Sequence, residues 1–149
     1  MKHTLDNLEG LYIGDVCYAL EDDVYYTEWG TKHNFQDGLI TTENNLQFAV
    51  AGTYFGDGLY YDEYFNEYPV DAGVIGVVDL RLATKYNQEE LNKLGLVIPE
   101  ANKVEFDVNE GIFYITAYKN NEEIKNITID TFGNDEWDDE EDDDGDWYF

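Results

Sequence analysis

The sequence contains few basic residues and little of the chemistry that usually builds a catalytic or metal site. Eight lysines and arginines stand against 34 acidic residues, which gives a formal net charge of −26. The two histidines, His3 and His33, do not fall into a metal-ligand spacing. From these residues we expect no metal site and no cofactor. Because so acidic a surface repels nucleic acid, we also expect no direct nucleic-acid binding.

Cysteine and long apolar runs are also scarce. Cys17 is the single cysteine, so an intramolecular disulfide is excluded and a reducing compartment is favoured. Nowhere do eighteen uncharged apolar residues follow one another, and the amino-terminal segment MKHTLDNLEG lacks the apolar core of a signal peptide. We therefore expect a cytoplasmic protein that does not associate with a membrane.

The sequence does contain enough apolar material for the core of one domain, with 43% hydrophobic and 16% aromatic residues in 149. The predicted fold class is α+β, mainly antiparallel β. We expect a single compact sheet, a sandwich or a barrel, with two short helices and an acidic disordered C-terminal tail. The predicted boundaries are 1–133 for the β-rich globular domain and 134–149 for the tail, and a dimer is compatible with the sequence.

Short alternating segments predict the strands. Residues 70–82 follow Pro69 and carry apolar side chains at both odd and even positions, which predicts a central strand that is buried on both faces. Gly56-Asp57-Gly58 predicts a hairpin turn between Tyr54-Phe55 and Leu59-Tyr60-Tyr61. A further hairpin is expected over 39–50, and segments 103–108, 111–118 and 122–131 predict a three-stranded antiparallel meander.

Helix signals occur at two places. The acidic residues Glu21-Asp22-Asp23 precede an aromatic segment that ends at Gly30, which predicts one short helix. Asn87, with Glu90 three residues later, predicts a capped second helix over 87–95. Leu11 to Ile13 read as a strand that turns at Gly14-Asp15, and His3 is expected in a frayed terminus.

The composition changes abruptly at Asn134. Ten of the 34 acidic residues follow it, so the preceding part retains 24 acidic and all eight basic residues, a net charge of −16. An acidic segment that ends in aromatic residues resembles the C-terminal tips of bacterial and phage single-stranded DNA-binding proteins, which dock partner enzymes. The body departs from that family, which needs a basic groove with aromatic platforms, so the resemblance implies docking by the tail alone.

Two carboxylates in a cleft could perform general acid–base catalysis or glycoside hydrolysis. Asp57 and Asp71 are the candidates, because neighbouring glycines place both in turns. Such coincidences are expected among 34 acidic residues, so we expect no enzyme. Asp142 to Asp146 superficially resembles a calcium loop, but the glutamate at the twelfth position of an EF-hand is absent.

The charge itself supports the preferred functional hypothesis. Duplex DNA carries one charge per roughly 1.7 Å of axis, so 26 charges correspond to roughly 44 Å, or about 13 base pairs. Residues two apart on a strand lie about 6.6 Å apart on one face, which places Glu105 and Asp107 outward. In this respect the chain resembles the small acidic DNA-mimic proteins with which phages and mobile elements block restriction enzymes, CRISPR effectors or other host nucleases.

The resemblance implies an acidic inhibitor protein that imitates nucleic acid and blocks a DNA- or RNA-binding host defence protein or nuclease. Its partner would be a basic protein. The predicted contact residues are acidic groups of the body, together with acidic and aromatic residues of the tail: Asp62, Glu63, Glu67, Glu105, Asp107, Glu122, Glu123, Trp137, Asp138, Asp139, Glu140, Glu141, Asp142, Asp143, Asp144, Asp146, Trp147, Tyr148 and Phe149.

Besides the less favoured small carboxylate-dependent enzyme considered above, two other hypotheses remain open at this point. The first is an immunity protein that neutralises a basic nuclease toxin, with buried aromatic anchors drawn from Tyr60, Tyr61, Tyr64 and Phe65. The second is a highly soluble protein whose acidic faces are merely solvated. Segments such as Gly14-Asp15 and Val70 to Gly73 also resemble small phage and bacterial proteins, which bears on source more than on activity.

Overall fold

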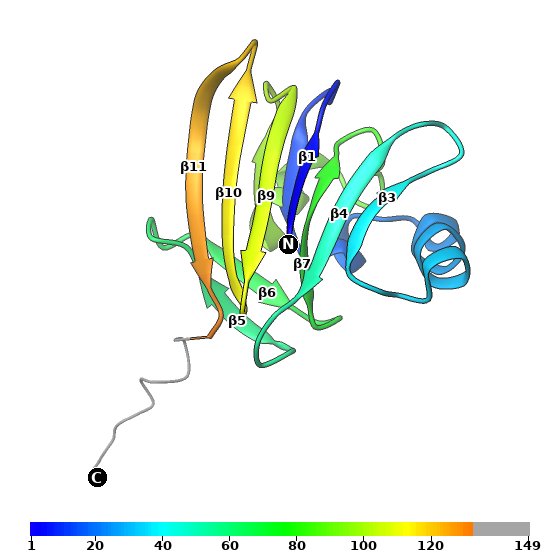
Figure 1. Ribbon diagram of the computed structural model, residues 1–149, viewed down its shortest axis with the longest axis horizontal. Helices are drawn as coiled ribbons and strands as arrows, with labels where there is room; N and C mark the ends of the chain where they lie inside the picture. The colour runs from blue at the N-terminus through cyan, green and yellow to red at the C-terminus, as the bar shows by residue number, and fades with distance from the viewer. Residues whose placement is uncertain (133–149) are drawn as a thin grey trace, which may run out of the picture.

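The computed structural model describes residues 1–132, whose strand pairs are antiparallel and form two main sheets and a small hairpin (Figure 1). The four-stranded sheet has the order β1 (Lys2–Leu5), β9 (Lys103–Asn109), β10 (Ile112–Lys119), β11 (Glu122–Asp130). The five-stranded sheet has the order β3 (Gly38–Thr41), β4 (Gln47–Gly52), β7 (Val74–Asp79), β2 (Leu11–Gly14), β8 (Gly95–Ile98). β5 (Gly58–Tyr61) and β6 (Glu67–Val70) form the hairpin.

One apolar core lies between the two main sheets. Phe106 and Phe113 from the four-stranded sheet pack in the same buried cluster as Ile13 and Val77 from the five-stranded sheet. Tyr68 of the hairpin joins this cluster, so β5 and β6 cover one side of the core. Removal of this apolar surface from water is the main stabilising term, at about 25 cal/mol per Å².

The other face of the five-stranded sheet is covered by helices. Its Phe48 and Val78 share a second buried cluster with Trp29 and Leu91. Trp29 belongs to η2 (Val24–Thr31), and Leu91 belongs to α1 (Gln88–Leu94). All six residues of β7 are buried, because one face of the strand meets each cluster. The predicted central strand is therefore confirmed, although it is shorter than residues 70–82.

Both predicted helices are present. The Asn87 side chain accepts a hydrogen bond from the Glu90 amide at 2.9 Å, which is the expected cap of α1. η2 is a π-helix, and the amide of Lys32 donates to the carbonyl of Thr27, five residues earlier. A short 3-10 helix, η1 (Val16–Tyr18), follows β2. Within residues 1–132 no helix has the length and apolarity needed to cross a membrane.

The meander of β9, β10 and β11 and the hairpin of β3 and β4 are confirmed, whereas the barrel alternative is wrong, because the sheets do not close on each other. The hairpin predicted across Gly56-Asp57-Gly58 is also wrong. β5 pairs with β6, and Tyr54-Phe55 is not a strand. The Thr53 hydroxyl donates to the Gly56 carbonyl at 2.6 Å, which folds this segment into a compact loop.

The amino terminus is not frayed. β1 pairs with β9 along its whole length, and His3 lies opposite Phe106. The Met1 ammonium group and the Val108 carbonyl are 3.0 Å apart, which ties the first residue to the sheet. β8 was not anticipated either, because its four residues follow α1 directly, with Gly95 serving both as the helix C-cap and as the first strand residue.

Candidate protein-binding surface

Glu105 and Asp107 lie on the outer face of β9, as the alternation predicts. Both side chains are partly exposed, whereas the intervening Phe106 is fully buried in the core. The register places Asp107 between Lys2 on β1 and Tyr114 on β10. The carboxylates on this face are therefore spaced along the strand at about 6.6 Å, and the neighbouring strands supply a lysine and a tyrosine beside them.

Tyrosine and lysine side chains continue this outer face. The Tyr118 hydroxyl donates a hydrogen bond to Glu105 at 3.1 Å, and the Lys103 ammonium lies 5.3 Å from the centre of the Tyr118 ring. This ring packs between a cation and a carboxylate, which restrains both charged groups. The face consequently combines carboxylates with aromatic and basic groups, and its charge is mixed at this end of β9.

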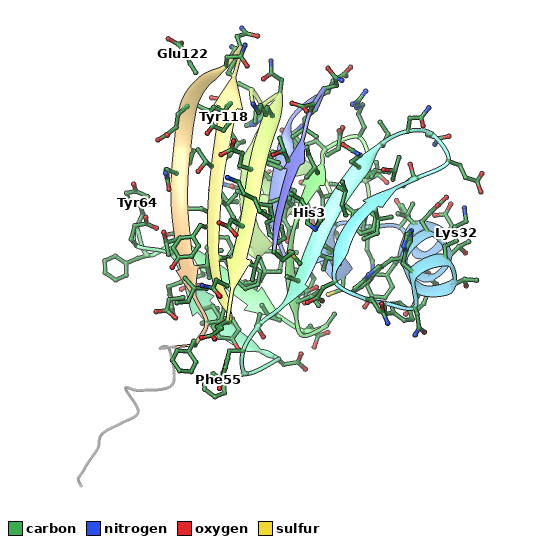
Figure 2. All side chains as sticks on the ribbon, viewed as in Figure 1. His3, Lys32, Phe55, Tyr64, Tyr118 and Glu122 are labelled. Atoms are coloured by element: carbon green, nitrogen blue, oxygen red, sulfur yellow. The ribbon has the colours of Figure 1, made fainter. Side chains whose placement is uncertain are left out.

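Three of the remaining predicted acidic residues of the body, Glu63, Glu122 and Glu123, lie in or beside β11. Glu122 and Glu123 begin the strand, and Figure 2 shows Glu122 at one end of it and Tyr64 beside it. Glu63 lies near the opposite end, where its carboxylate accepts a hydrogen bond from the Thr128 amide at 2.8 Å. Thr128 is five positions after Glu123, so Glu123 and the contact made by Glu63 are roughly 17 Å apart along β11. Glu67 is exposed at the start of β6.

Asp62 is not available to a partner, which corrects the prediction for this residue. Its exposed fraction is 4%. One carboxylate oxygen accepts hydrogen bonds from the amides of Tyr64 and Asn66 at 2.8 and 3.1 Å. The other oxygen accepts from the Asn66 side-chain amide at 2.9 Å and from the Tyr68 hydroxyl at 2.8 Å. Asp62 therefore holds the β5–β6 turn together from inside.

The burial of Tyr68 beside Asp62, which raises the pKa of Tyr68, makes stability dependent on pH in the alkaline range. Burial, the hydrogen bond to Asp62 and the charges of Asp62 and Glu63 raise the pKa of Tyr68. Unfolded tyrosine loses its proton near pH 10, whereas folded Tyr68 keeps its proton. The stabilisation is complete below pH 10, and above it each such tyrosine lowers the free energy of unfolding by about 1.4 kcal/mol per pH unit.

We expect Tyr68→Phe to reduce this alkaline slope by about 1.4 kcal/mol per pH unit, because one proton fewer distinguishes the folded and unfolded states. Urea unfolding followed by circular dichroism between pH 9 and pH 11 measures the slope. Identical slopes for the wild type and the variant would contradict the assignment of a raised pKa to Tyr68.

The structure brings the turns of Asp57 and Asp71 close together. A Cβ at Gly73 would lie 3.8 Å from a carboxylate oxygen of Asp57, and the Thr53 amide donates to the Gly73 carbonyl. Both aspartates are exposed. Within residues 1–132 no group of three or more histidine, cysteine, aspartate or glutamate side chains is arranged to hold a metal ion.

Asp15 organises this region and was missed by sequence reasoning. It is fully buried, and one carboxylate oxygen accepts from the Cys17 amide at 2.9 Å. The other oxygen accepts from the amides of Asp71 and Ala72, both at 2.7 Å. The available signal was the sequence Asp15-Val16-Cys17, in which an aspartate precedes a short helical turn and can cap it.

Cys17 lines a small cavity of about 230 Å³ together with Asp22, Tyr25, Asp71 and Lys85 among others. Burial, the charge of Asp15 and a hydrogen bond to Asp15 raise the pKa of the Cys17 thiol. The thiol consequently remains protonated at neutral pH and is a poor nucleophile. The structure supports the interpretation of Cys17 as a packing residue.

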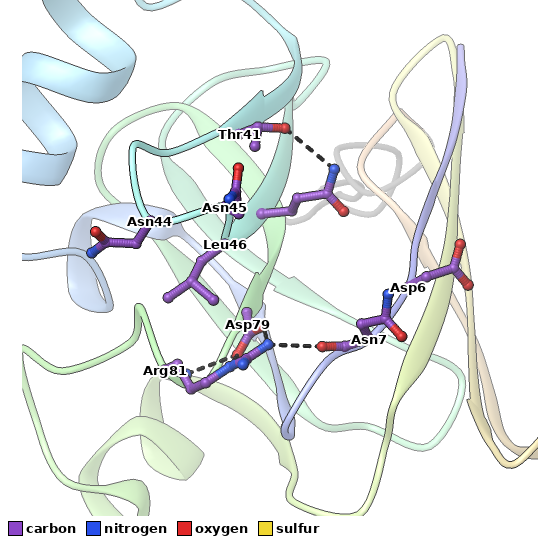
Figure 3. Close-up of a pocket in the computed structure, with 9 residues that line it drawn as sticks. Asp6, Asn7, Thr41, Asn44, Asn45, Leu46, Asp79 and Arg81 are labelled. Carbon is purple, nitrogen blue, oxygen red and sulfur yellow. Dashed lines mark hydrogen bonds and ion pairs between the residues drawn. The ribbon is translucent and has the colours of Figure 1, made fainter.

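A second cavity, of about 500 Å³, is lined mainly by polar side chains (Figure 3). Arg81 is held there by Asp79, whose two carboxylate oxygens accept from the Arg81 Nε and Nη2 atoms at 3.1 and 2.7 Å. The same Nη2 atom donates to the Asn7 carbonyl at 2.7 Å. Arg81 therefore ties the end of β7 to the loop between β1 and β2, and its charge is already paired with Asp79 and Glu9.

The exposed cluster of Tyr54, Phe55 and Phe132 is a surface feature that sequence reasoning missed, whereas Phe65 was among the candidate aromatic anchors. The Tyr54 ring centre lies 4.8 Å from that of Phe55 and 4.5 Å from that of Phe132, and all three rings are exposed. Phe65, at the β5–β6 turn, is 82% exposed. The incorrect assignment of Tyr54-Phe55 to a strand hid the first group.

The predicted contact residues Trp137 to Phe149, like the whole segment 134–149, lie outside the described residues. Comparison of the chain with protein-family models, with curated proteins and with solved structures found no match.

Proposed function

We propose that this protein is an acidic inhibitor that binds a basic, nucleic-acid-binding protein in place of nucleic acid and blocks it. The observation that carries the proposal is the position of the carboxylates. Of the acidic residues in 1–132, Asp15, Asp62 and Asp79 are buried, and the others lie at least partly at the surface. The ion pairs of Lys32 and Arg81 engage Glu28, Glu43, Glu9 and the buried Asp79.

Such a surface favours association with a cationic groove, because complementary charge accelerates encounter and displaced counterions add affinity. Host defence proteins and nucleases that bind DNA or RNA carry grooves of this kind. The outer face of β9, β10 and β11 is the proposed contact, since Glu105 and Asp107 project from it and Glu63 and Glu123 lie along its edge.

The test is displacement of a fluorescent 13-base-pair duplex from a panel of purified basic proteins: protamine, one restriction endonuclease, one non-specific DNase and one ribonuclease. Nuclease activity is measured in parallel from 50 to 300 mM NaCl. We expect displacement and inhibition that weaken steeply with salt. Polyglutamate at the same total concentration of negative charge is the control. If the folded surface contributes to binding, the protein should inhibit at a lower concentration of negative charge than polyglutamate does.

The contact face is assigned with charge-neutralising variants. The double variant Glu105→Gln, Asp107→Asn should weaken inhibition at least tenfold, because it removes the two outward carboxylates of β9. The matched control is Glu89→Gln, Glu90→Gln in α1, which removes the same charge from an exposed site elsewhere. Equal losses for both pairs would mean that net charge alone acts, and failure to bind any member of the panel would reject the proposal.

A second candidate, an immunity protein for a basic nuclease toxin, is favoured by a different observation. Specific inhibitors use rigid aromatic anchors at the centre of the interface, and Phe65 is displayed at the β5–β6 turn. Inhibition confined to one nuclease and tolerant of 300 mM NaCl would favour this candidate over imitation of nucleic acid.

A further inference from the structure

The β5–β6 turn, residues 62–66, displays an aromatic side chain in an unusual way. Phe65 is 82% exposed, and its φ of +66° lies in the left-handed region. Bulky residues rarely adopt this conformation, because it brings the Cβ atom too close to the backbone. Glycine and asparagine tolerate a positive φ much better than phenylalanine does. Phe65 therefore has an unfavourable backbone conformation and gains little from burial of its own ring.

Phe35 shows what normally offsets such a conformation. It also has a positive φ, of +56°, but its ring lies 5.2 Å from that of Trp29 and 5.7 Å from that of Tyr25. These aromatic contacts recover free energy within the folded chain. The ring pairs found among the described residues include Phe35 and do not include Phe65. Within residues 1–132, the ring of Phe65 therefore lacks the aromatic packing that accompanies the positive φ of Phe35.

The turn that carries Phe65 is rigidly held. The amide of Phe65 donates to the Asp62 carbonyl at 3.0 Å, and the Asp62 amide donates to the Asn66 carbonyl at 3.2 Å. The buried Asp62 carboxylate accepts from the amides on both sides of Phe65, at Tyr64 and Asn66. Because the backbone is already fixed, a partner that binds the Phe65 ring pays little conformational entropy to order it.

The turn is also attached to the four-stranded sheet. The Lys125 ammonium lies 4.6 Å from the centre of the Tyr64 ring, and Glu63 accepts from the Thr128 amide. An isolated bridge between Asp62 and Ile129 extends this contact along β11. Phe65 consequently stands beside β11, at the edge of the outer face that we assign to partner binding (Figure 2 labels the adjacent Tyr64).

We propose that Phe65 is a preformed anchor that enters an apolar pocket on a basic partner protein, with Glu63 and Glu67 meeting lysine or arginine side chains around that pocket. The negative charge around Phe65 favours a basic partner over the other possible occupants. Glu63 and Glu67 are exposed beside the anchor, and the body carries −16. A second copy of the chain and the tail, with its ten carboxylates, would both be repelled. The inference rests on the proposed function, applies equally to its second candidate because both bind a basic nuclease, and adds the position of the binding anchor.

The test uses the full chain with Phe65→Asn, because asparagine tolerates a positive φ and keeps the turn. The matched control is Phe55→Asn, another exposed phenylalanine, outside the turn. We expect the urea midpoint of Phe65→Asn to equal or exceed that of the wild type. We also expect its affinity for the nuclease that the wild type inhibits most strongly to fall at least tenfold, mainly through faster dissociation. Its affinity for protamine, which offers charge without a folded pocket, should stay within twofold.

Each outcome decides the matter. A lower urea midpoint for Phe65→Asn would show that the ring packs within the chain and would overturn the inference, as would unchanged affinity for the nuclease. If the wild type is a dimer and Phe65→Asn is not, the ring binds a second copy of the chain. If Phe65→Asn changes nuclease affinity only in a chain that ends at Asn134, the ring binds the tail. Either result would also overturn the inference.

The two proposals can fail separately. If Phe65→Asn binds the nuclease normally while the Glu105 and Asp107 variant does not, the anchor is rejected and imitation of nucleic acid survives. If only Phe65→Asn loses affinity, the anchor is supported and the β9 contact is rejected. If the wild type binds no member of the panel, the proposed function and the anchor that rests on it are both overturned.

Discussion

Replacing Asp15 by asparagine is expected to lower the free energy of unfolding by about 3 kcal/mol. The carboxylate is fully buried, and its two oxygens accept from the amides of Cys17, Asp71 and Ala72. An asparagine of the same shape has one acceptor oxygen and presents an NH₂ group to the remaining donors. Relief of the buried charge offsets part of this loss, but donors that face donors cost more.

Urea unfolding at pH 7, followed by far-ultraviolet circular dichroism, measures this effect of Asp15→Asn. Asp22→Asn is the control, because Asp22 is an exposed acid near the same cavity, and its removal should change stability by less than about 0.5 kcal/mol. A midpoint for Asp15→Asn equal to that of the control would mean that the three amides do not depend on this carboxylate.

Gly76→Ala is expected to destabilise the protein by about 3 kcal/mol, although alanine in place of glycine usually stabilises a strand. Gly76 lies in the centre of β7, opposite Val50 of β4. An added Cβ would collide with the carbonyl oxygen of Ala49 and would lie 2.7 Å from Cγ1 of Val16. Because that carbonyl belongs to a paired strand, it cannot withdraw without disturbing the ladder.

Gly52→Ala provides the matched control for Gly76→Ala. Gly52 ends the neighbouring strand β4, and an added Cβ there would come no closer than 3.8 Å to the Gly73 carbonyl oxygen. That variant should be as stable as the wild type, or slightly more so through reduced entropy of the unfolded chain. Equal urea midpoints for the two variants would contradict the close approach of β4 and β7.

The candidate surface was predictable where local periodicity governs it. The alternation of Val104 to Val108 places Glu105 and Asp107 outward on any sheet with one buried face, and the structure has this arrangement. Asp62 has the same acidic chemistry but is buried. The Tyr68 hydroxyl donates a hydrogen bond to it from the opposite strand of the hairpin, and no local pattern around Asp62 indicates this contact.

The anchor at Phe65 illustrates the same limit. Its aromatic type suggested binding, but neighbouring Tyr60 and Tyr68 have similar chemistry and are buried at 3% and 0% exposure. The exposed side of this hairpin is decided by which face packs on the core between the two sheets. That choice is a tertiary contact, so the sequence could not rank Phe65 above the other aromatic residues.

The sequence by itself determined the strong negative charge, the meander from β9 to β11, the central strand β7 and the capped helix α1. These features follow from composition, two-residue alternation and short-range capping. Only the tertiary structure decided the pairing of β1 with β9, the division into two sheets, and the burial of Asp15 and Asp62. These depend on contacts between distant parts of the chain, such as Met1 with Val108, whose free energy is not encoded in any local pattern.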